Sequence, residues 1–189
     1  MAIFSLIELV RLILMSAAIG YILMDFIKSP TTVNNPLYPK KMFNWEDFRF
    51  ATIVTAPGIV LHELGHKFVG LAMGIQTEFF ASKFGLFLGI FLKWIGSPFI
   101  IFAPGYVSLA GTITHFQRFL TSFAGPAMNL LMFFGAYLIL DRKRNLTRNQ
   151  AIALHMTKKI NLFLFMFNLI PLPPFDGYHV FTSLFKMIF

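Results

Sequence analysis

The stretch Val60-Leu61-His62-Glu63-Leu64-Gly65-His66-Lys67-Phe68 lies inside an apolar run that extends over residues 50–73. If this run is a helix, His62 and His66 are four residues apart and return to nearly the same face, so both imidazoles can bind one metal ion. Glu63 lies on the flank of that face, from which its carboxylate can reach a water molecule on the metal. The pattern therefore predicts a metal site on a helix, with Glu63 as a candidate general base.

The alternative for this stretch is a packed helix with two buried histidines and a capping glutamate. The position of the residues in the run argues against it. The run is long enough to cross a bilayer, and at a rise of about 1.5 Å per residue His62 lies roughly 18 Å from Phe50, near mid-span. A carboxylate at that depth costs a few kcal/mol and is rarely kept without a partner or a function.

The composition is typical of a polytopic membrane protein. Of 189 residues, 57% are hydrophobic and 25 are phenylalanine, which is more apolar surface than a soluble domain of this length needs. The net charge is +8, and the basic residues lie mostly between apolar runs, as expected for contact with anionic lipid headgroups. We therefore expect the lipid bilayer as a partner and no nucleic acid. The chain has no cysteine, so any transition metal must be held by His, Asp or Glu.

The apolar runs predict about four transmembrane helices in a single membrane-embedded domain that comprises residues 1–189. These helices are expected at residues 1–27, 50–73, 119–140 and 160–189, the last of them broken. Residues 1–27 lack a basic n-region and are long for a signal peptide, so we expect a retained helix. Within it, Glu8 and Arg11 are three residues apart and can neutralise each other. Residues 28–49 are predicted as a polar linker and residues 141–159 as a polar loop.

Residues 74–118 lack the pattern of a regular transmembrane helix. Several short runs rich in Phe, Ile and Val end in turn residues, and Lys93, Gly96 and Pro98 interrupt the apolar segment 84–103. Non-helical backbone at membrane depth must be shielded by protein or face a wet cavity. We therefore expect short strands or a re-entrant element, and a full span over 84–103 is the alternative.

Two further stretches bring polar groups into apolar segments. The predicted third helix contains Phe123-Ala124-Gly125-Pro126-Ala127-Met128-Asn129, where small residues allow another helix to come close. The Asn129 amide is either a helix–helix hydrogen bond or part of the site. The last segment is interrupted at Asn168-Leu169-Ile170-Pro171-Leu172-Pro173-Pro174-Phe175-Asp176-Gly177, because three prolines in four positions cannot continue a helix. Unwound membrane segments of this kind commonly line functional sites.

A catalytic zinc ion typically takes three protein ligands, so two histidines leave one position to fill. Asp176 is the best candidate, because an unpaired carboxylate in an apolar segment would be costly and Gly177 allows a tight turn beside it. Some acidic residues near the ends of other segments are alternatives, together with His115, His155, His179, Asp141 and Glu78.

Three motifs in this order resemble the site-2 protease family of intramembrane zinc metalloproteases. They are His62-Glu63-Leu64-Gly65-His66, Gly125-Pro126-Ala127-Met128-Asn129, and Asn168-x-x-Pro171-x-x-x-x-Asp176-Gly177. The resemblance implies that one zinc ion per chain is bound by His62, His66 and Asp176. It implies that Glu63 is the general base, and that Asn129 and Asn168 lie beside the substrate. It also implies a membrane-associated β-hairpin after the motif helix, within residues 74–118.

The expected fold is thus an all-α polytopic membrane protein with about four transmembrane helices and a small β-hairpin or re-entrant element between the second and third. The expected function is that of a multi-pass cell-membrane zinc metalloprotease. It would hydrolyse peptide bonds of transmembrane protein substrates with a zinc-activated water and Glu63 as base, in regulated intramembrane proteolysis. The alternative is a non-enzymatic membrane protein that binds or transports metal. Such a protein needs no general base, so Glu63 separates the two.

Overall fold

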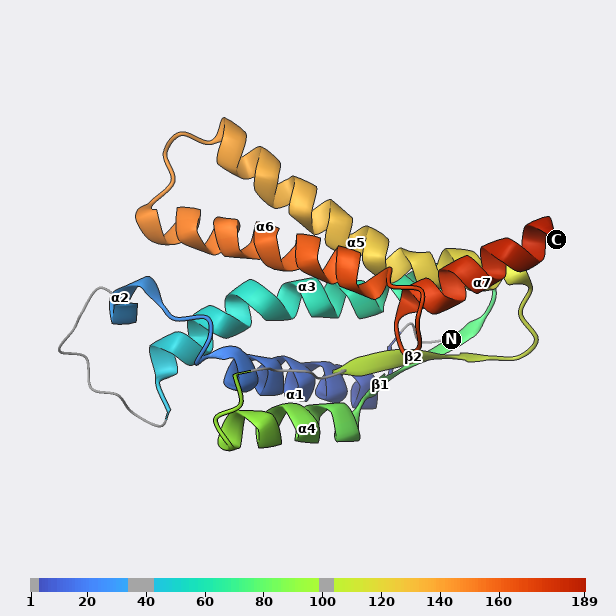
Figure 1. The fold of residues 1–189 in the computed structure, drawn as a ribbon, viewed down its shortest axis with the longest axis horizontal. Helices are drawn as coiled ribbons and strands as arrows, with labels where there is room; N and C mark the ends of the chain where they lie inside the picture. Colours follow the sequence, from blue (N-terminus) through green and yellow to red (C-terminus); the bar gives the residue numbers. More distant parts are fainter. Residues whose placement is uncertain (1–3, 34–42, 99–103) are drawn as a thin grey trace.

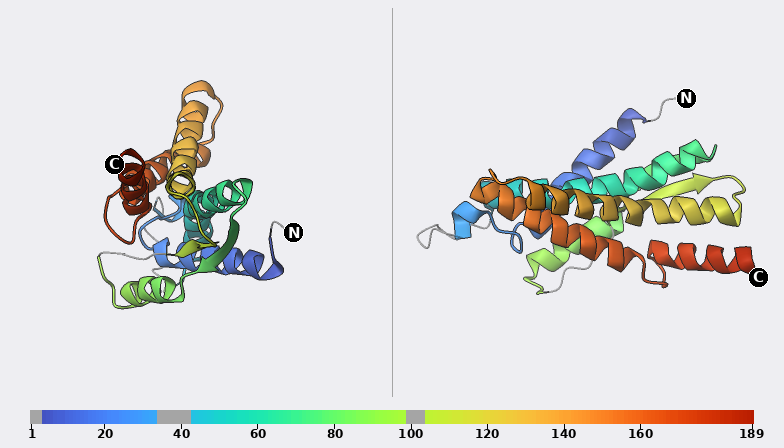
Figure 2. Two further views of the ribbon diagram at one scale, coloured as in Figure 1. Left: turned by 90° about the vertical axis from the view of Figure 1, so that its right-hand side faces the viewer. Right: turned by 90° about the horizontal axis from the view of Figure 1, so that it is seen from above.

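The computed structural model describes residues 4–33, 43–98 and 104–189, which form seven helices and two strands (Figure 1). α3 runs through the middle, with α1 and α4 on one side and α5 and α6 on the other, and α7 lies alongside α5 (Figures 1 and 2). The predicted helical fold with a small strand element is confirmed. In chain order the elements are α1 (Leu6–Leu23), α2 (Pro30–Val33), α3 (Trp45–Ala72), β1 (Gln76–Ala81), α4 (Lys83–Trp94), β2 (Gly105–Ala110), α5 (His115–Arg142), α6 (Arg148–Asn168) and α7 (Asp176–Ile188).

The motif helix α3 begins before the apolar run, within the predicted polar linker. Asn44 caps it, because its side-chain oxygen accepts hydrogen bonds from the backbone N–H groups of Glu46 and Asp47. Both acidic side chains lie in the first turn, where they favour the positive end of the helix dipole. The helix continues through Pro57 to Ala72, so the whole His62–His66 stretch lies on regular helix.

The sheet is a single antiparallel pair in which Phe79 of β1 lies opposite Val107 of β2. Gly74 turns the chain from α3 into β1 with φ of 75°, a conformation that favours glycine. β1 contacts both α1 and α3, and β2 also contacts α3. The hairpin expected between the second and third long helices is therefore present and lies against the motif helix.

Within residues 74–118, where short strands or a re-entrant element were expected, the structure also contains a short helix between the two strands. Residues Lys83–Trp94 form α4, which Ser82 caps by accepting a hydrogen bond from the backbone N–H of Gly85 at 3.1 Å. Twelve residues of helix extend for about 18 Å, too short for a hydrocarbon core of about 30 Å. α4 thus does not form the alternative full span, and residues 99–103 lie outside the described residues.

The predicted polar loop over residues 141–159 is also wrong, because α6 already begins at Arg148. Thr147 and Gln150 form a capping box, in which each side chain accepts a hydrogen bond from the backbone N–H of the other residue. Of the basic residues in the predicted loop, Arg148, Lys158 and Lys159 lie on this helix, whereas Lys143 and Arg144 lie in the short connection before it. The predicted break is confirmed: α6 ends at Asn168 and α7 starts at Asp176, with the prolines between them.

By length and composition, two helices in the described part of the chain can cross a membrane, α1 and α5. α3 and α6, which contain the predicted second span and the first part of the predicted fourth span, are not among them, so the four predicted spans are not confirmed. α1 nevertheless holds two charged side chains, Glu8 and Arg11. They do not pair with each other as expected: Glu8 forms an ion pair with Lys67 of α3, and Arg11 pairs with Glu78 of β1 at 2.7 Å.

Candidate metal centre

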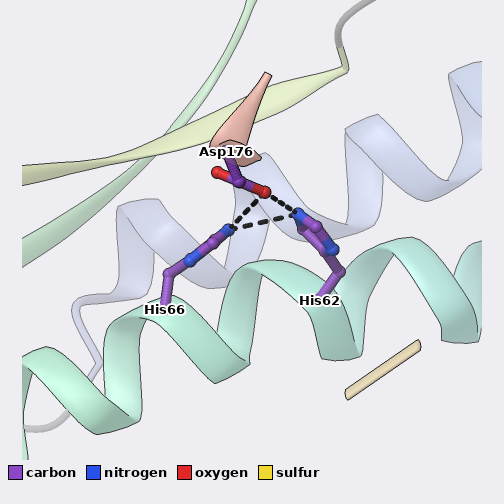
Figure 3. A group of neighbouring side chains, drawn as sticks. All are labelled: His62, His66 and Asp176. Carbon is purple, nitrogen blue, oxygen red and sulfur yellow. Dashed lines mark hydrogen bonds and ion pairs between the residues drawn. The ribbon is translucent and has the colours of Figure 1, made fainter. Parts of the chain in front are cut away.

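Three side chains converge where α7 begins beside α3 (Figure 3). Nε2 of His62 lies 3.1 Å from Nε2 of His66, and Oδ2 of Asp176 lies 3.1 Å from the first nitrogen and 3.3 Å from the second. Both histidines are buried and the aspartate is half-buried. The structure thus brings together the three predicted ligands. Among the described residues, none of the alternatives joins this group, that is His115, His155, His179, Asp141 or Glu78.

The hydrogen bonds of both imidazoles leave Nε2 without a proton. Nδ1 of His66 lies 2.7 Å from the backbone oxygen of Thr121, which can only accept, so Nδ1 donates. Nδ1 of His62 lies 2.7 Å from Oδ1 of Asn129, whose Nδ2 donates to the backbone oxygen of Gly58 at 3.0 Å. A neutral imidazole carries one ring proton. With that proton on Nδ1 in each ring, both Nε2 atoms present lone pairs to the centre.

Two nitrogen lone pairs and a carboxylate oxygen that face one another fit a cation. Ligands about 2.0–2.1 Å from a tetrahedral zinc ion lie about 3.3 Å from one another. The three separations at this centre are 3.1, 3.1 and 3.3 Å. Two histidines and one carboxylate are also a common ligand set of catalytic zinc, with the fourth position open to water. The residues present therefore fit zinc.

Gly125 of α5 lies against the same two nitrogens. A Cβ atom on Gly125 would lie 2.3 Å from Nε2 of His66 and 2.7 Å from Nε2 of His62. On the facing helix, Gly65 of α3 allows α5 to come equally close, because a Cβ there would lie 2.7 Å from the backbone oxygen of Ala124. The sequence predicts only that small residues let two helices come close. The structure adds that the missing side chain of Gly125 keeps open the space beside the histidines.

Asp176 reaches the centre because the chain unwinds after α6. The carboxylate lies in the first turn of α7, where the helix dipole favours a negative charge. Gly177 allows α7 to pack against the end of α6: a Cβ there would lie 2.4 Å from the backbone oxygen of Leu169 and 2.5 Å from that of Ile170. The turn predicted beside Asp176 is therefore present, and it requires glycine.

Glu63 is buried, with 5% of its surface exposed. It is close enough to the three candidate ligands to interact electrostatically with all of them. Among the described residues, its Oε2 has no hydrogen-bond partner. A buried carboxylate oxygen without a partner is costly, and a water molecule at the metal would satisfy it. This position suits a general base that acts on water.

The two asparagines predicted beside the substrate occupy different environments. Asn129 is fully buried, and its amide bonds to His62, Gly58 and Asn161. This is the helix–helix hydrogen bond foreseen as one alternative, and it also orients a candidate ligand. Asn168 is half-buried as the last residue of α6, and its Nδ2 donates to the backbone oxygen of Leu164 at 3.0 Å. Its contact with substrate stays a prediction.

Asn161 is a polar residue of the site that sequence reasoning missed. It lies on α6, is fully buried and bonds to Asn129. A signal was available, because Asn161 and Asn168 are seven residues apart and so lie on the same face of a helix.

Comparison with known proteins identifies similar chains. The family model described as "Peptidase family M50" matches residues 50–147, about half of the chain, which includes both histidines and Asn129 but not Asp176. No solved structure matches.

Three curated proteins are similar over much of the chain. The "Putative zinc metalloprotease MJ0611" of Methanocaldococcus jannaschii is 36% identical over 135 residues, 69% of this chain and 68% of that protein. The "Putative zinc metalloprotease YwhC" of Bacillus subtilis is 30% identical over 155 residues, 71% of this chain and 68% of that protein. The "Putative zinc metalloprotease sll0528" of Synechocystis is 35% identical over 127 residues, 67% of this chain and 28% of that protein.

Proposed function

Because this chain belongs to peptidase family M50, the site-2 protease family, we propose that it is a zinc metalloprotease that hydrolyses peptide bonds of transmembrane proteins within or beside the bilayer. The observation that carries the proposal is the convergence of the three candidate ligands next to a buried, unpartnered carboxylate oxygen of Glu63, as seen among the described residues. His62, His66 and Asp176 would hold one zinc ion per chain. The names of the three relatives support this metal and this reaction.

The residues of the centre have separate roles in the proposed reaction. When bound, zinc supplies a Lewis acid that makes water more acidic and polarises the carbonyl of the scissile peptide bond. His62 and His66 each direct an Nε2 lone pair to the metal, and the hydrogen bonds at Nδ1 hold the rings in that orientation. Glu63 accepts a proton from the attacking water and delivers it to the leaving amine.

The proposed location is the cell membrane, which the chain would cross four times. α1 and α5 have the length and apolar composition that a span needs. We assign the other two spans to α3 and to the segment that α6, the break and α7 form together. Lys67 in the apolar part of α3 supports this assignment, because it pairs with Glu8 of α1. A paired charge is tolerated at membrane depth far better than a lone one.

The substrate must be locally extended, and the hairpin can bind it as an added strand. On β1, the backbone N–H of Phe79 donates to Glu8 at 2.8 Å and its oxygen accepts from Arg11 at 2.8 Å. α1 therefore already occupies the outer edge of β1. Since Phe79 pairs with Val107, the backbone groups of Val107 point away from β1. We infer that a substrate strand pairs with this outer edge of β2.

The alternative is a membrane protein that binds or transports metal without catalysis. It would use the same three ligands but would have no use for a base. In the described structure, Oε2 of Glu63 is buried beside those ligands without a hydrogen-bond partner, which is costly, and a water molecule held for catalysis would offset that cost. This observation favours the protease.

The experiment that tests the proposal combines metal analysis with proteolysis. The full chain is purified in detergent, its metal content is measured, and it is incubated with a model transmembrane peptide. We expect zinc to be present and the peptide to be cleaved, with cleavage lost on chelation and restored by added zinc. Zinc without cleavage of the peptide would favour the transport alternative, and absence of any bound metal would reject both.

A further inference from the structure

A chain of hydrogen bonds connects three helices behind the metal centre. It starts at Nδ1 of His62 on α3 and reaches Oδ1 of Asn129 on α5 at 2.7 Å. Nδ2 of Asn129 donates to Oδ1 of Asn161 on α6 at 3.0 Å, and Nδ2 of Asn161 donates to the backbone oxygen of Thr157 at 2.9 Å. Neither amide has any exposed surface. The chain therefore links a candidate ligand to a helix that contributes no ligand.

The direction of each hydrogen bond follows from two backbone oxygens that can only accept. The oxygen of Thr157 requires the NH2 group of Asn161 to face it, which turns Oδ1 of Asn161 toward Asn129. Asn129 must then present its NH2 group both to that oxygen and to the backbone oxygen of Gly58. Turning the Asn129 amide over would bring its oxygen against two acceptors, at the cost of two hydrogen bonds.

The only group of Asn129 left for His62 is Oδ1, so Nδ1 of the imidazole must carry the proton. The proton on Nδ1 leaves the lone pair on Nε2, the atom that faces His66 and Asp176. The tautomer of His62 is thus set through Asn129, whose amide is oriented jointly by the backbone oxygen of Gly58 on α3 and by Asn161 on α6. A hydrogen bond to the second ring nitrogen commonly fixes the tautomer and orientation of a metal-binding histidine.

The close packing around Asn161 keeps this arrangement in place. A Cβ atom on Gly58 would lie 2.6 Å from Oδ1 of Asn161, so α3 and α6 meet at a glycine with the amide directly against it. Burial of two amides in an apolar bundle is costly unless they are hydrogen-bonded. Here, among the described residues, neither amide has a buried atom without a partner. The network is complete, and removal of one member leaves its neighbour unsatisfied.

We propose that Asn161 is a positioning residue for the metal centre, which acts through Asn129 to hold His62 in its metal-binding tautomer and orientation. The inference rests on the proposed function, because it takes His62 to be a zinc ligand. In the described structure, Asn161 forms hydrogen bonds to Asn129 and Thr157 and none to His62, His66 or Asp176. Its effect on zinc must therefore depend on Asn129.

The test is a double-mutant cycle read out as zinc affinity. Asn161→Leu, Asn129→Leu and the double variant are purified as full chains in detergent, stripped of metal, and titrated with zinc against a chromophoric chelator. Residues that orient a metal ligand typically contribute about 10–100-fold to metal affinity. We expect Asn129→Leu to weaken zinc within this range and Asn161→Leu to weaken it about tenfold. In the Asn129→Leu background, the second substitution should cost nothing further.

A matched control separates positioning from a general loss of packing. Thr55 is buried on α3, and among the described residues its hydroxyl bonds within that helix, to the backbone oxygen of Ala51 at 2.7 Å. Thr55→Val removes a buried hydrogen bond without touching the chain to His62, so its zinc affinity should match the wild type. If Asn161→Leu does not fold, Gly58→Ala displaces the same amide from the other side and should also weaken zinc.

The possible results distinguish this inference from the function on which it rests. Equal zinc affinity of the wild type and Asn161→Leu, or independent effects that multiply in the double variant, would overturn the positioning role alone. A wild-type protein without zinc would overturn the proposed function as well. Visible spectra of the cobalt-substituted proteins give a second measurement, since displacement of His62 should change the spectra of both single variants in the same way.

Discussion

Lys67 and Glu8 form an ion pair in the interior of the protein, directly after the second histidine of the motif helix. The ammonium donates to Oε1 of Glu8 and to the backbone oxygen of Thr77 at 3.3 Å, and Lys67 has only 2% of its surface exposed. The same carboxylate oxygen accepts from the backbone N–H of Phe79 at 2.8 Å. This ion pair thus joins α1, α3 and β1, and it fixes the hairpin against the turn of α3 that carries His66.

We predict that this pair stabilises the fold only as a pair. Lys67→Met or Glu8→Gln alone leaves a buried charged or polar group without its partner, which typically costs about 3–5 kcal/mol in the free energy of unfolding. The double variant should recover part of that loss. Unfolding of the detergent-purified proteins measures the effect. Glu78→Gln is the control, because Glu78 is half exposed in its pair with Arg11 and should cost less than about 1 kcal/mol. Equal losses for Lys67→Met and Glu78→Gln would contradict the prediction.

A second prediction concerns the ligands. His66→Ala should abolish zinc binding, and Asp176→Ala should reduce it strongly, because each removes one of only three protein ligands. His179→Ala is the matched control: this residue follows Asp176 by three positions but stays outside the group that the described residues form. Zinc content is measured after dialysis against a weak chelator. Full retention of zinc in Asp176→Ala would reject Asp176 as the third ligand.

A third prediction uses two glycines of the same helix. Gly125→Ala should prevent zinc binding, since the new methyl group would lie 2.3 Å from Nε2 of His66 and something must shift. Gly135→Ala should leave zinc unchanged, because nothing lies within 4 Å of a Cβ at that position. Alanine is also the better helix former by up to about 1 kcal/mol, so Gly135→Ala should be no less stable than the wild type. Normal zinc affinity of Gly125→Ala would show that the space beside the histidines is not needed.

The fourth prediction decides between protease and transporter. Glu63→Gln keeps the size of the side chain but removes its basicity, and zinc should remain bound because Glu63 is not among the three candidate ligands. Loss of a general base typically lowers the rate by about 10²–10⁴, which corresponds to roughly 3–5 kcal/mol in the barrier. Zinc content and cleavage of a transmembrane peptide are measured in one preparation. Cleavage near the wild-type rate with zinc present would reject the proposed mechanism.

The last prediction concerns substrate contact at the break between α6 and α7. Asn168 donates one amide hydrogen to the backbone of its own helix. Its second amide hydrogen and its amide oxygen can therefore bond to an extended substrate. Asn168→Ala should therefore weaken cleavage while zinc stays bound. Asn161→Leu, in contrast, should bind zinc more weakly. If Asn168→Ala loses metal, its role is to support the turn that carries Asp176.

Several features that depend on neighbours a few residues apart could be predicted from the sequence. His62 and His66 share a face because a helix repeats every 3.6 residues. The break before Asp176 follows from prolines that cannot continue a helix. The start of α6 could also have been predicted, because Thr147 and Gln150 have the spacing of a capping box.

Only the tertiary structure decided which helix faces meet. By its position in the sequence, Glu8 could pair with Arg11 on the same helix. It pairs with Lys67 instead, because α1 packs against α3 and Arg11 lies beside the hairpin. The same holds for the groups behind the metal centre, where Gly125 and Asn161 come from helices far along the chain. Their roles depend on the relative rotation and distance of packed helices. The periodicity of a single helix contains neither quantity. The sequence therefore identifies the candidate ligands, and only the tertiary structure shows which side chains orient them and which glycine leaves space beside them.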